Sequence, residues 1–343
     1  MTKLTICIPV EPGGPPPTRL VRQLLIDPQT DIDVIVAPYD AACRHVVELQ
    51  QWAFEDKRLE ILPPAPQNVA KALFWLATVA SATGDWVTIL LPGDTIDMDL
   101  VAILTDIEQT LPQVDALAWG SGVHPPAAPT DSTTNDCVAI EKDRMLGAFF
   151  QWTGSRQVPD MPFGLYHGAI RRTLLDTIIS TGGPSSWMTP LPQYEWSARI
   201  LIFASSLGFC SRPLSTARSV DYAPQAVRSA PGSFPFNASL GITAAVAEIQ
   251  CRLLHELGME WTGFTEDFLQ ACMLDCMIEC DTNRLYERCQ AYVDAICRME
   301  DGRSVLAKSF LPDFLNRQHD AMVQGLASVS AVADLIPDRI LSA

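Results

Sequence analysis

One short stretch of the sequence joins a strand-like apolar run to a carboxylate. The run Trp86 to Leu91 is almost entirely apolar, and it leads directly into Pro92-Gly93-Asp94. Proline and glycine mark a tight turn, so we expect Asp94 to present its carboxylate just beyond the end of a buried strand. Two interpretations stay open. Asp94 belongs to a ligand site at the sheet edge, or it lies in an ordinary turn and caps the next helix.

Cysteine is the second residue type that could carry chemistry. Cys272, Cys276 and Cys280 recur every four residues and therefore share one stripe of a helix, while Cys289 and Cys297 fall on the next apolar stripe. One interpretation is a metal or cluster site. The interpretation that we favour is an apolar core, because free cysteine packs as a small hydrophobe and the spacing matches no common metal-ligand pattern.

The elements that must position Asp94 alternate between strands and helices. The predicted strands are Leu4 to Val10, Asp33 to Ala37, Leu59 to Leu62, Trp86 to Leu91, Asp115 to Trp119 and Phe163 to Ile170. Apolar strands alternating with helical patterns predict an α/β fold with a mostly parallel central sheet and helices on both faces. Ligands of such sheets bind beyond the carboxyl ends of the strands. The loops after Val10, Ala37 and Leu91 should therefore meet at that edge.

The C-terminal third has a different pattern. A segment rich in proline, serine and alanine, at residues 223–236, predicts a linker, and residues 237–343 read as an all-helical region. Its apolar residues repeat with a period near 3.6, beginning with Ile242, Val246 and Ile249. We expect this stripe to complete the core or form a homodimer interface. An acceptor or membrane-surface role is the less favoured alternative, because the region is acidic and anionic lipid attracts basic faces.

Composition narrows the classes of protein. The chain has 343 residues, 48% of them hydrophobic, and a formal net charge of -16. This charge argues against nucleic acid as the main partner, and it means that a negatively charged substrate needs a local cation. The stretch MTKLTICIPV reads as a first strand instead of a signal peptide. We therefore expect free thiols and a cytoplasmic location, with a peripheral place at the inner face of the membrane as the alternative.

The order of several weak motifs resembles the inverting glycosyltransferases of family 2, which have the GT-A nucleotide-sugar fold. The resemblance covers about the first 220 residues, so it assigns residues 1–222 to a GT-A-like domain. It rests on the strand ending in Pro9, on Ala82-Thr83-Gly84 before a strand, on Pro92-Gly93-Asp94, on Arg171-Arg172 followed by Gly182-Gly183, and on Tyr194-Glu195-Trp196. The resemblance implies transfer of a sugar from a nucleotide-sugar donor, favouring a UDP-sugar, to a glycan, lipid-linked or protein acceptor in polysaccharide biosynthesis.

The resemblance also implies roles for individual residues. Asp94 would bind a divalent cation, Mn2+ or Mg2+, that neutralises the donor's diphosphate. Glu195 would be the general base that takes the proton from the acceptor hydroxyl, although it could also be a surface acid in the first turn of a helix. The residues expected near the donor are Pro9, Glu11, Tyr39, Asp40, Lys71, Arg171 and Arg172. For the two arginines, a solvated strand end or an ion pair is an equal alternative.

The chain departs from the family pattern at three places. Leu91 and Gly93 stand where the family has acids before its metal-binding Asp, so one carboxylate remains. Ala37-Pro38-Tyr39 replaces the acid that follows the second strand, and Glu11 replaces an Asn or Asp after the first. Two function classes follow. One is an active, metal-assisted glycosyltransferase, and the other is a catalytically inactive relative that binds a glycan or a partner protein.

Overall fold

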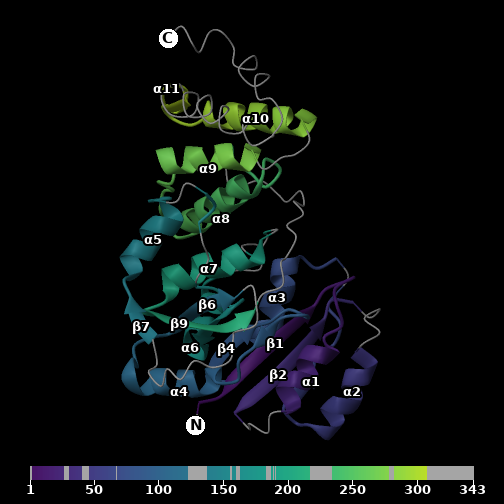
Figure 1. Ribbon diagram of the computed structural model, residues 1–343. Helices are drawn as coiled ribbons and strands as arrows, with labels where there is room; N and C mark the ends of the chain where they lie inside the picture. Colours follow the sequence, from purple (N-terminus) through teal and green to yellow (C-terminus); the bar gives the residue numbers. More distant parts are fainter. Residues whose placement is uncertain are drawn as a thin grey trace. The chain divides into compact units, whose positions relative to one another are not determined.

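The computed structural model (Figure 1) describes residues 2–26, 31–40, 46–66, 68–122, 137–154, 157–159, 163–182, 187, 189, 191–216, 234–277 and 282–306. The chain divides into two compact units. One comprises Met1–Lys142 and Met161–Tyr222, and the other comprises Asp143–Asp160 and Ala223–Ala343. Residues 143–160 thus lie within the span that the sequence assigns to the first domain but belong to the second unit. Most of the predicted linker lies outside the described residues.

The first unit is built on one central sheet. In the described part of the chain this sheet has nine strands in the order β3-β2-β1-β4-β8-β6-β9-β5, and β7 pairs with β9. The strands are β1 (Leu4–Val10), β2 (Ile32–Pro38), β3 (Leu59–Ile61), β4 (Trp86–Ile89), β5 (Thr95–Ile96), β6 (Ala116–Gly122), β7 (Cys137–Ile140), β8 (Gly168–Arg171) and β9 (Leu207–Thr216).

The half of the sheet that carries the predicted ligand edge is parallel. β1 pairs in parallel with β2 and β4, with Leu4 opposite Ile32 on one side and Trp86 on the other. Every residue of β1 is buried, as expected for a strand covered on both faces. The prediction that the strands before Glu11, Tyr39 and Asp94 are neighbours with their carboxyl ends at one edge is confirmed.

The other half of the sheet is mixed. β8 lies between β4 and β6 and is antiparallel to both, whereas β6 and β9 are parallel. The expected parallel character therefore describes β3 to β4 and the β6–β9 pair, but not the whole sheet. A short apolar run such as β8 shows burial equally well in either direction, so the sequence pattern does not reveal its orientation.

Helices cover both faces of the sheet, as predicted. On one face, α1 (Thr18–Ile26), α2 (Val46–Glu55) and α4 (Leu100–Thr110) contribute Leu24, Leu49 and Leu104 to a core shared with Ile6 and Ile8 of β1. On the other face, α3 (Lys71–Ala80) contacts β1, α6 (Arg172–Thr181) and α7 (Pro192–Phe203). The alternation of β1 side chains between faces gives each helical layer its own apolar surface.

The second unit is helical in its described part. It contains α5 (Lys142–Phe150), α8 (Ile242–Glu256), α9 (Glu266–Met277), α10 (Thr282–Ile296) and α11 (Gly302–Val305). Gln250 of α8 ties three segments together, because its Oε1 accepts the indole N–H groups of Trp152 and Trp261, both at 3.0 Å, and its Nε2 donates to the carbonyl of Phe149. These bonds satisfy a fully buried amide. The helical C-terminal region is therefore confirmed for residues 234–277 and 282–306.

The tail cysteines pack as core residues where the structure describes them. Cys272, Cys276 and Cys289 are buried free thiols, Cys297 is half-buried, and Cys280 lies outside the described residues. Burial raises the pKa of the Cys272 thiol well above its usual range, which keeps the thiol neutral. Within the described ranges, no cluster of three or more His, Cys, Asp or Glu side chains has the arrangement of a metal site. Among these same residues, no helix combines the length and the apolar character needed to cross a bilayer.

Candidate functional site

The carboxyl edge of the parallel strands gathers several polar side chains. Glu11 follows β1, Tyr39 and Asp40 follow β2, and Asp94 follows β4. The loops after β1 and β2 are joined by the backbone N–H of Tyr39, which donates to the carbonyl of Val10 at 2.9 Å. An open sheet with parallel strands binds its ligands at this edge. The sequence therefore placed these candidates on one side of the sheet.

Asp94 closes a tight turn around its own carboxylate. The backbone N–H of Asp94 donates to the carbonyl of Leu91 at 3.0 Å, and its Oδ2 accepts the N–H of Leu91 at 2.7 Å. Gly93 lies between them at φ +103°, a conformation that disfavours residues with a Cβ atom. The side chain of Asp94 is fully buried, and α4 begins only at Leu100. Asp94 therefore does not cap α4, which removes one of the two interpretations left open by the sequence.

Tyr166 and His167 lie against Asp94 from the segment before β8. The hydroxyl of Tyr166 is 3.4 Å from Asp94 Oδ1, and His167 Nε2 is 3.7 Å from Asp94 Oδ2. Burial and the neighbouring Asp94 carboxylate raise the pKa of Tyr166 far above its usual range, so the hydroxyl keeps its proton. Burial lowers the pKa of His167 to about 4, so the imidazole is neutral at pH 7 and its contact with Asp94 is not an ion pair.

His167 is held from its other side by two residues of the sheet. Its Nδ1 is 2.6 Å from Oγ of Ser215 in β9, and the same oxygen accepts the indole N–H of Trp119 in β6 at 2.6 Å. Its Nε2 is buried and finds no hydrogen-bond partner within the described part of the chain. The backbone of His167 lies in the left-handed region at φ +57°. Sequence reasoning missed Tyr166 and His167, because neither belongs to a recognisable motif; the pair of ring residues just before Gly168 is the only visible signal.

Glu11 and Lys71 form the second polar group at this edge. Lys71 Nζ is 2.8 Å from Glu11 Oε1 and 5.7 Å from the centre of the Trp75 ring. The Trp75 ring in turn meets the ring of Tyr166 edge-on, with 6.2 Å between their centres. A continuous series of contacts therefore links the cation of Lys71 to the carboxylate of Asp94, and it brings Lys71 and Glu11 to the predicted ligand edge.

Three other candidates at this edge have structural contacts. Pro9 lies inside β1, opposite Ala37 of β2, and offers no side-chain polar group. The hydroxyl of Tyr39 donates to the carbonyl of Val69, and its ring packs edge-on against Phe74 with 5.1 Å between centres. Tyr39 thus anchors the loop after β2. Asp40 follows it on the same side of the sheet.

The structure does not bring Arg171 and Arg172 to this edge. Because β8 is antiparallel to β4, Arg171 pairs with Trp86 at the amino end of β4, opposite to the end that leads to Asp94. Arg171 donates from Nε to the carbonyl of Val114 at 2.7 Å and lies over the Trp86 ring, whereas Arg172 pairs with Asp176 at 2.8 Å in α6. Arg171 therefore joins β8 to its neighbours at the opposite edge of the sheet, and Arg172 forms an ion pair within α6, in agreement with the ion-pair alternative.

Glu195 lies near the beginning of α7 in a buried ion pair. Its side chain is fully buried, and its Oε1 accepts hydrogen bonds from Nε and Nη2 of Arg199 at 2.8 Å and 2.7 Å. The guanidinium of Arg199 lies 4.3 Å from the centre of the Trp187 ring. Glu195 is therefore not a surface acid, which was the alternative interpretation of the sequence. It is a carboxylate whose exchange of a proton with an acceptor would require this pair to open.

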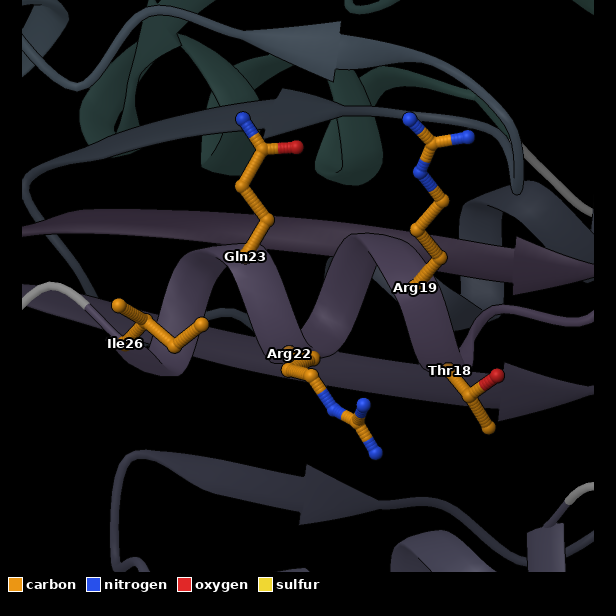
Figure 2. A pocket seen from close by; sticks show the side chains of 5 residues that line it. All are labelled: Thr18, Arg19, Arg22, Gln23 and Ile26. Carbon is orange, nitrogen blue, oxygen red and sulfur yellow. The ribbon is translucent and has the colours of Figure 1, made fainter.

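A pocket on α1 does not gather polar side chains around one point as the edge around Asp94 does. It is lined by Thr18, Arg19, Arg22, Gln23 and Ile26, all from one helix (Figure 2). Figure 2 shows Arg19 and Gln23 extending to one side of the helix and Arg22 extending to the other. Arg22 lies over the ring of Trp52 at 5.2 Å, so its guanidinium packs against α2. The side chains do not point to one spot, and the edge around Asp94 remains the candidate site.

Comparisons with known proteins find similarity only at the level of solved structures. No family model and no curated protein matches the sequence. S. aureus TarS 1–349 in complex with UDP-GlcNAc is 13% identical, with a TM-score of 0.47, over 98% of this chain and 82% of that chain. The mannosyltransferase PcManGT from Pyrobaculum calidifontis, in complex with GDP-Man and Mn2+, is 11% identical, with a TM-score of 0.44, over 97% and 79%. At these identities and TM-scores, the similarities do not establish a family for this chain.

Proposed function

We propose that this chain is a glycosyltransferase that moves a sugar from a nucleotide-sugar donor to an acceptor hydroxyl with inversion at the anomeric carbon. The observation that carries the proposal is the buried Asp94 carboxylate at the carboxyl edge of β1, β2 and β4, facing Tyr166 and His167. The ordered motifs of the sequence add to it. The acceptor class, glycan, lipid-linked or protein, stays open, as do the homodimer and the place at a membrane surface.

Binding a diphosphate at this edge requires positive charge. The chain carries a net charge of -16, and both Asp94 and Glu11 are acidic, so a donor diphosphate would be repelled without a cation. A divalent cation on Asp94, Mn2+ or Mg2+, would neutralise the diphosphate and stabilise it as a leaving group. The buried Nε2 atom of His167, which has no hydrogen-bond partner among the described residues, lies beside the carboxylate and fits a bound cation. Lys71 supplies the nearest resident positive charge in the series of contacts described above, 2.8 Å from Glu11.

The tight turn contributes preorganisation. Because the Leu91 N–H holds Asp94 Oδ2 at 2.7 Å, the carboxylate loses little freedom when it binds a ligand. The protonated hydroxyl of Tyr166 is a donor directed at the other carboxylate oxygen, at 3.4 Å. Both contacts fix the direction of the carboxylate before a ligand arrives.

Glu195 remains the proposed general base, and its surroundings define what catalysis demands. To take the acceptor proton, the carboxylate must exchange the guanidinium of Arg199, at 2.7 Å, for a substrate hydroxyl. The buried ion pair is also the specific observation that favours the second candidate function. A chain whose Glu195 never leaves Arg199 would bind the donor or a glycan without transferring the sugar.

The test of donor binding is thermal denaturation with UDP, GDP, UDP-sugars and GDP-sugars, each with and without Mn2+. A ligand that binds only the folded state stabilises it by about 2.7 kcal/mol at a concentration one hundred times its Kd. We expect one nucleotide series, with UDP favoured, to raise the melting temperature only when Mn2+ is present. Equal melting temperatures in every condition would contradict a nucleotide-sugar site.

A second measurement separates the two functions. Incubating the protein with the stabilising nucleotide sugar and a panel of acceptor glycans should release the nucleoside diphosphate if the chain is a transferase. Metal-dependent binding without release, with acceptors of all three classes, would instead favour the catalytically inactive binding protein.

A further inference from the structure

The imidazole nitrogen of His167 that faces Asp94 is buried and unsatisfied among the described residues. Only 9% of the His167 side chain is exposed, and among the residues that the structure describes its Nε2 has no hydrogen-bond partner, while Asp94 Oδ2 lies 3.7 Å away. Leaving a polar atom unsatisfied in the interior costs about 1–3 kcal/mol, so such an atom calls for an explanation. We propose that His167 and Asp94 together form a two-ligand cation site that prefers a transition cation such as Mn2+ and is completed by diphosphate oxygens. This inference rests on the function proposed above.

The separation of the two atoms suits a shared cation. Two ligands at about 2.1 Å from one metal lie roughly 3.0 Å apart in an octahedron and 3.4 Å apart in a tetrahedron. The distance of 3.7 Å between Nε2 and Oδ2 exceeds these values by a few tenths of an ångström, which a small rotation of either side chain removes. A direct N–H···O hydrogen bond would need about 2.7–3.2 Å, so the pair is spaced too widely for one.

The hydrogen bonds on the far side of the ring support the required tautomer. A metal-binding Nε2 must carry a lone pair, so the proton must be on Nδ1. Nδ1 faces Ser215 Oγ at 2.6 Å, and a hydroxyl oxygen has two lone pairs, one of which accepts the indole N–H of Trp119. The other lone pair can accept a hydrogen bond from Nδ1–H. This arrangement, in which a second residue fixes the ring and its tautomer, is the usual support of a metal-binding histidine.

Asp94 keeps its capacity to bind while it holds the turn. An ionised carboxylate has about four lone-pair positions on its two oxygens. Oδ2 accepts a hydrogen bond from the N–H of Leu91 at 2.7 Å, and the Tyr166 hydroxyl approaches Oδ1 at 3.4 Å. The turn therefore fixes the direction of the carboxylate beside His167.

The backbone places the imidazole at an energetic cost. A residue with a side chain at φ +57° is strained by about 1–3 kcal/mol, and such strain persists where the surroundings enforce it. The residue that follows His167 is closely surrounded by backbone. A Cβ atom on Gly168 would lie 2.2 Å from the carbonyl oxygen of Gly164, so the chain before β8 is tightly folded on itself. This packing fixes the ring beside Asp94.

The donor set predicts both affinity and selectivity. Two protein ligands leave most coordination positions of a divalent cation to water and phosphate oxygens, so we expect weak binding of the cation alone and much tighter binding with a nucleoside diphosphate. Imidazole nitrogen favours first-row transition cations, of which Mn2+ binds most weakly and also accepts oxygen ligands, whereas Mg2+ and Ca2+ prefer oxygen ligands. His167 should therefore determine the preference for Mn2+ over Mg2+.

The experiment measures Mn2+ binding by electron paramagnetic resonance, in which free Mn2+ gives a strong signal that is lost on binding. Titrations with Mn2+ alone, Mn2+ with UDP and Mn2+ with GDP are compared for the wild type, His167→Asn and His255→Asn. Asparagine tolerates positive φ, so His167→Asn is expected to fold. His255 is exposed at the end of α8, and its replacement is the matched control. We expect at least about a tenfold weaker Mn2+ affinity for His167→Asn only, together with a loss of the preference for Mn2+ over Mg2+.

A pulsed measurement on the wild-type protein gives an answer even if His167→Asn fails to fold. Imidazole nitrogen bound to Mn2+ produces a characteristic 14N modulation of the electron spin echo, and the inference requires that modulation in the Mn2+–nucleotide complex. Nucleotide-dependent Mn2+ binding without 14N modulation would overturn the role of His167 and leave the proposed donor site intact. Absence of any Mn2+ binding, with or without UDP or GDP, would contradict both.

Discussion

The ion pair between Glu195 and Arg199 provides the sharpest contrast between a catalytic and a structural role. Replacing Glu195 by Gln keeps the size of the side chain but removes a negative charge beside a guanidinium that is only 2% exposed. As the proposed base, Glu195 is needed for transfer, and as the buried partner of Arg199 it is also needed for stability, so Glu195→Gln should reduce both. The geometry favours a large loss of stability, because both charged groups are shielded from water.

The size of that loss follows from the burial of the pair. Breaking a buried ion pair from one side costs about 3–5 kcal/mol, and we expect the lower end because the Gln oxygen can still accept a hydrogen bond from Arg199. For a domain of about 200 residues, each kcal/mol lowers the melting temperature by roughly 2–4 °C, so the expected decrease is about 6–12 °C. Replacing the pair with Glu195→Leu and Arg199→Met together should recover most of this, since apolar substitutes for buried pairs are often neutral.

Thermal denaturation and turnover per folded molecule are measured on the same samples. Asp176→Asn is the matched control, because Asp176 and Arg172 form an i,i+4 pair of the same kind on exposed α6, with 57% of the Asp176 side chain accessible. That change should cost less than about 1 kcal/mol. A melting temperature for Glu195→Gln within about 1 °C of wild type would refute the structural reasoning. Turnover per folded molecule within about twofold of wild type, instead of a reduction of about 10²–10⁴-fold, would refute the role as base.

Two further predictions concern the helical unit. Asp275 Oδ2 accepts hydrogen bonds from the Thr243 N–H at 3.0 Å and the Tyr292 hydroxyl at 2.6 Å, and burial raises the pKa of the Asp275 carboxyl above 3.8. The folded state then holds a proton that the unfolded state releases, so this stabilisation is complete below the unfolded pKa and is lost as pH rises through the folded pKa. Asp275→Asn should therefore gain stability relative to wild type as pH rises above about 4 in chemical denaturation, and parallel pH profiles would contradict this. Because the tail thiols pack as core, elemental analysis should find no stoichiometric zinc or iron, and about one metal per chain, lost on Cys276→Ser, would overturn that prediction.

The sequence predicts the parallel half of the fold well because each strand there is a continuous apolar run. The observed β1 coincides with the predicted strand Leu4 to Val10, and the turn at Asp94 follows from its proline and glycine. The strands β5, β7 and β9 are not predicted. β9 contains Pro213 and Arg212 and pairs with β6 through two register shifts around Gly120, so its side chains lack the regular alternation of a strand.

The candidate site is only partly visible in the sequence, for a topological reason. Asp94, Glu11 and Lys71 follow elements whose direction is clear, and the fold brings them to one edge. The direction of β8 is not encoded in its apolar pattern, and this direction sends Arg171 away from the edge while it places His167 beside Asp94. The i,i+4 spacing of Glu195 and Arg199 is visible in the sequence, but the sequence does not show that α7 buries both side chains as an ion pair.

The central claim is that Asp94 holds a cation that binds the donor diphosphate, and calorimetric titration of Asp94→Asn tests it most directly. The amide keeps the shape of the side chain and an oxygen that can accept the Leu91 N–H, so the turn should persist. Asp97→Asn is the control, because Asp97 lies nearby but pairs with Arg212 at 2.5 Å. We expect Asp94→Asn to reduce UDP or GDP affinity in Mn2+ to its metal-free value, whereas Asp97→Asn retains the dependence on Mn2+. Superimposable Mn2+-dependent titrations for wild type and Asp94→Asn would contradict it.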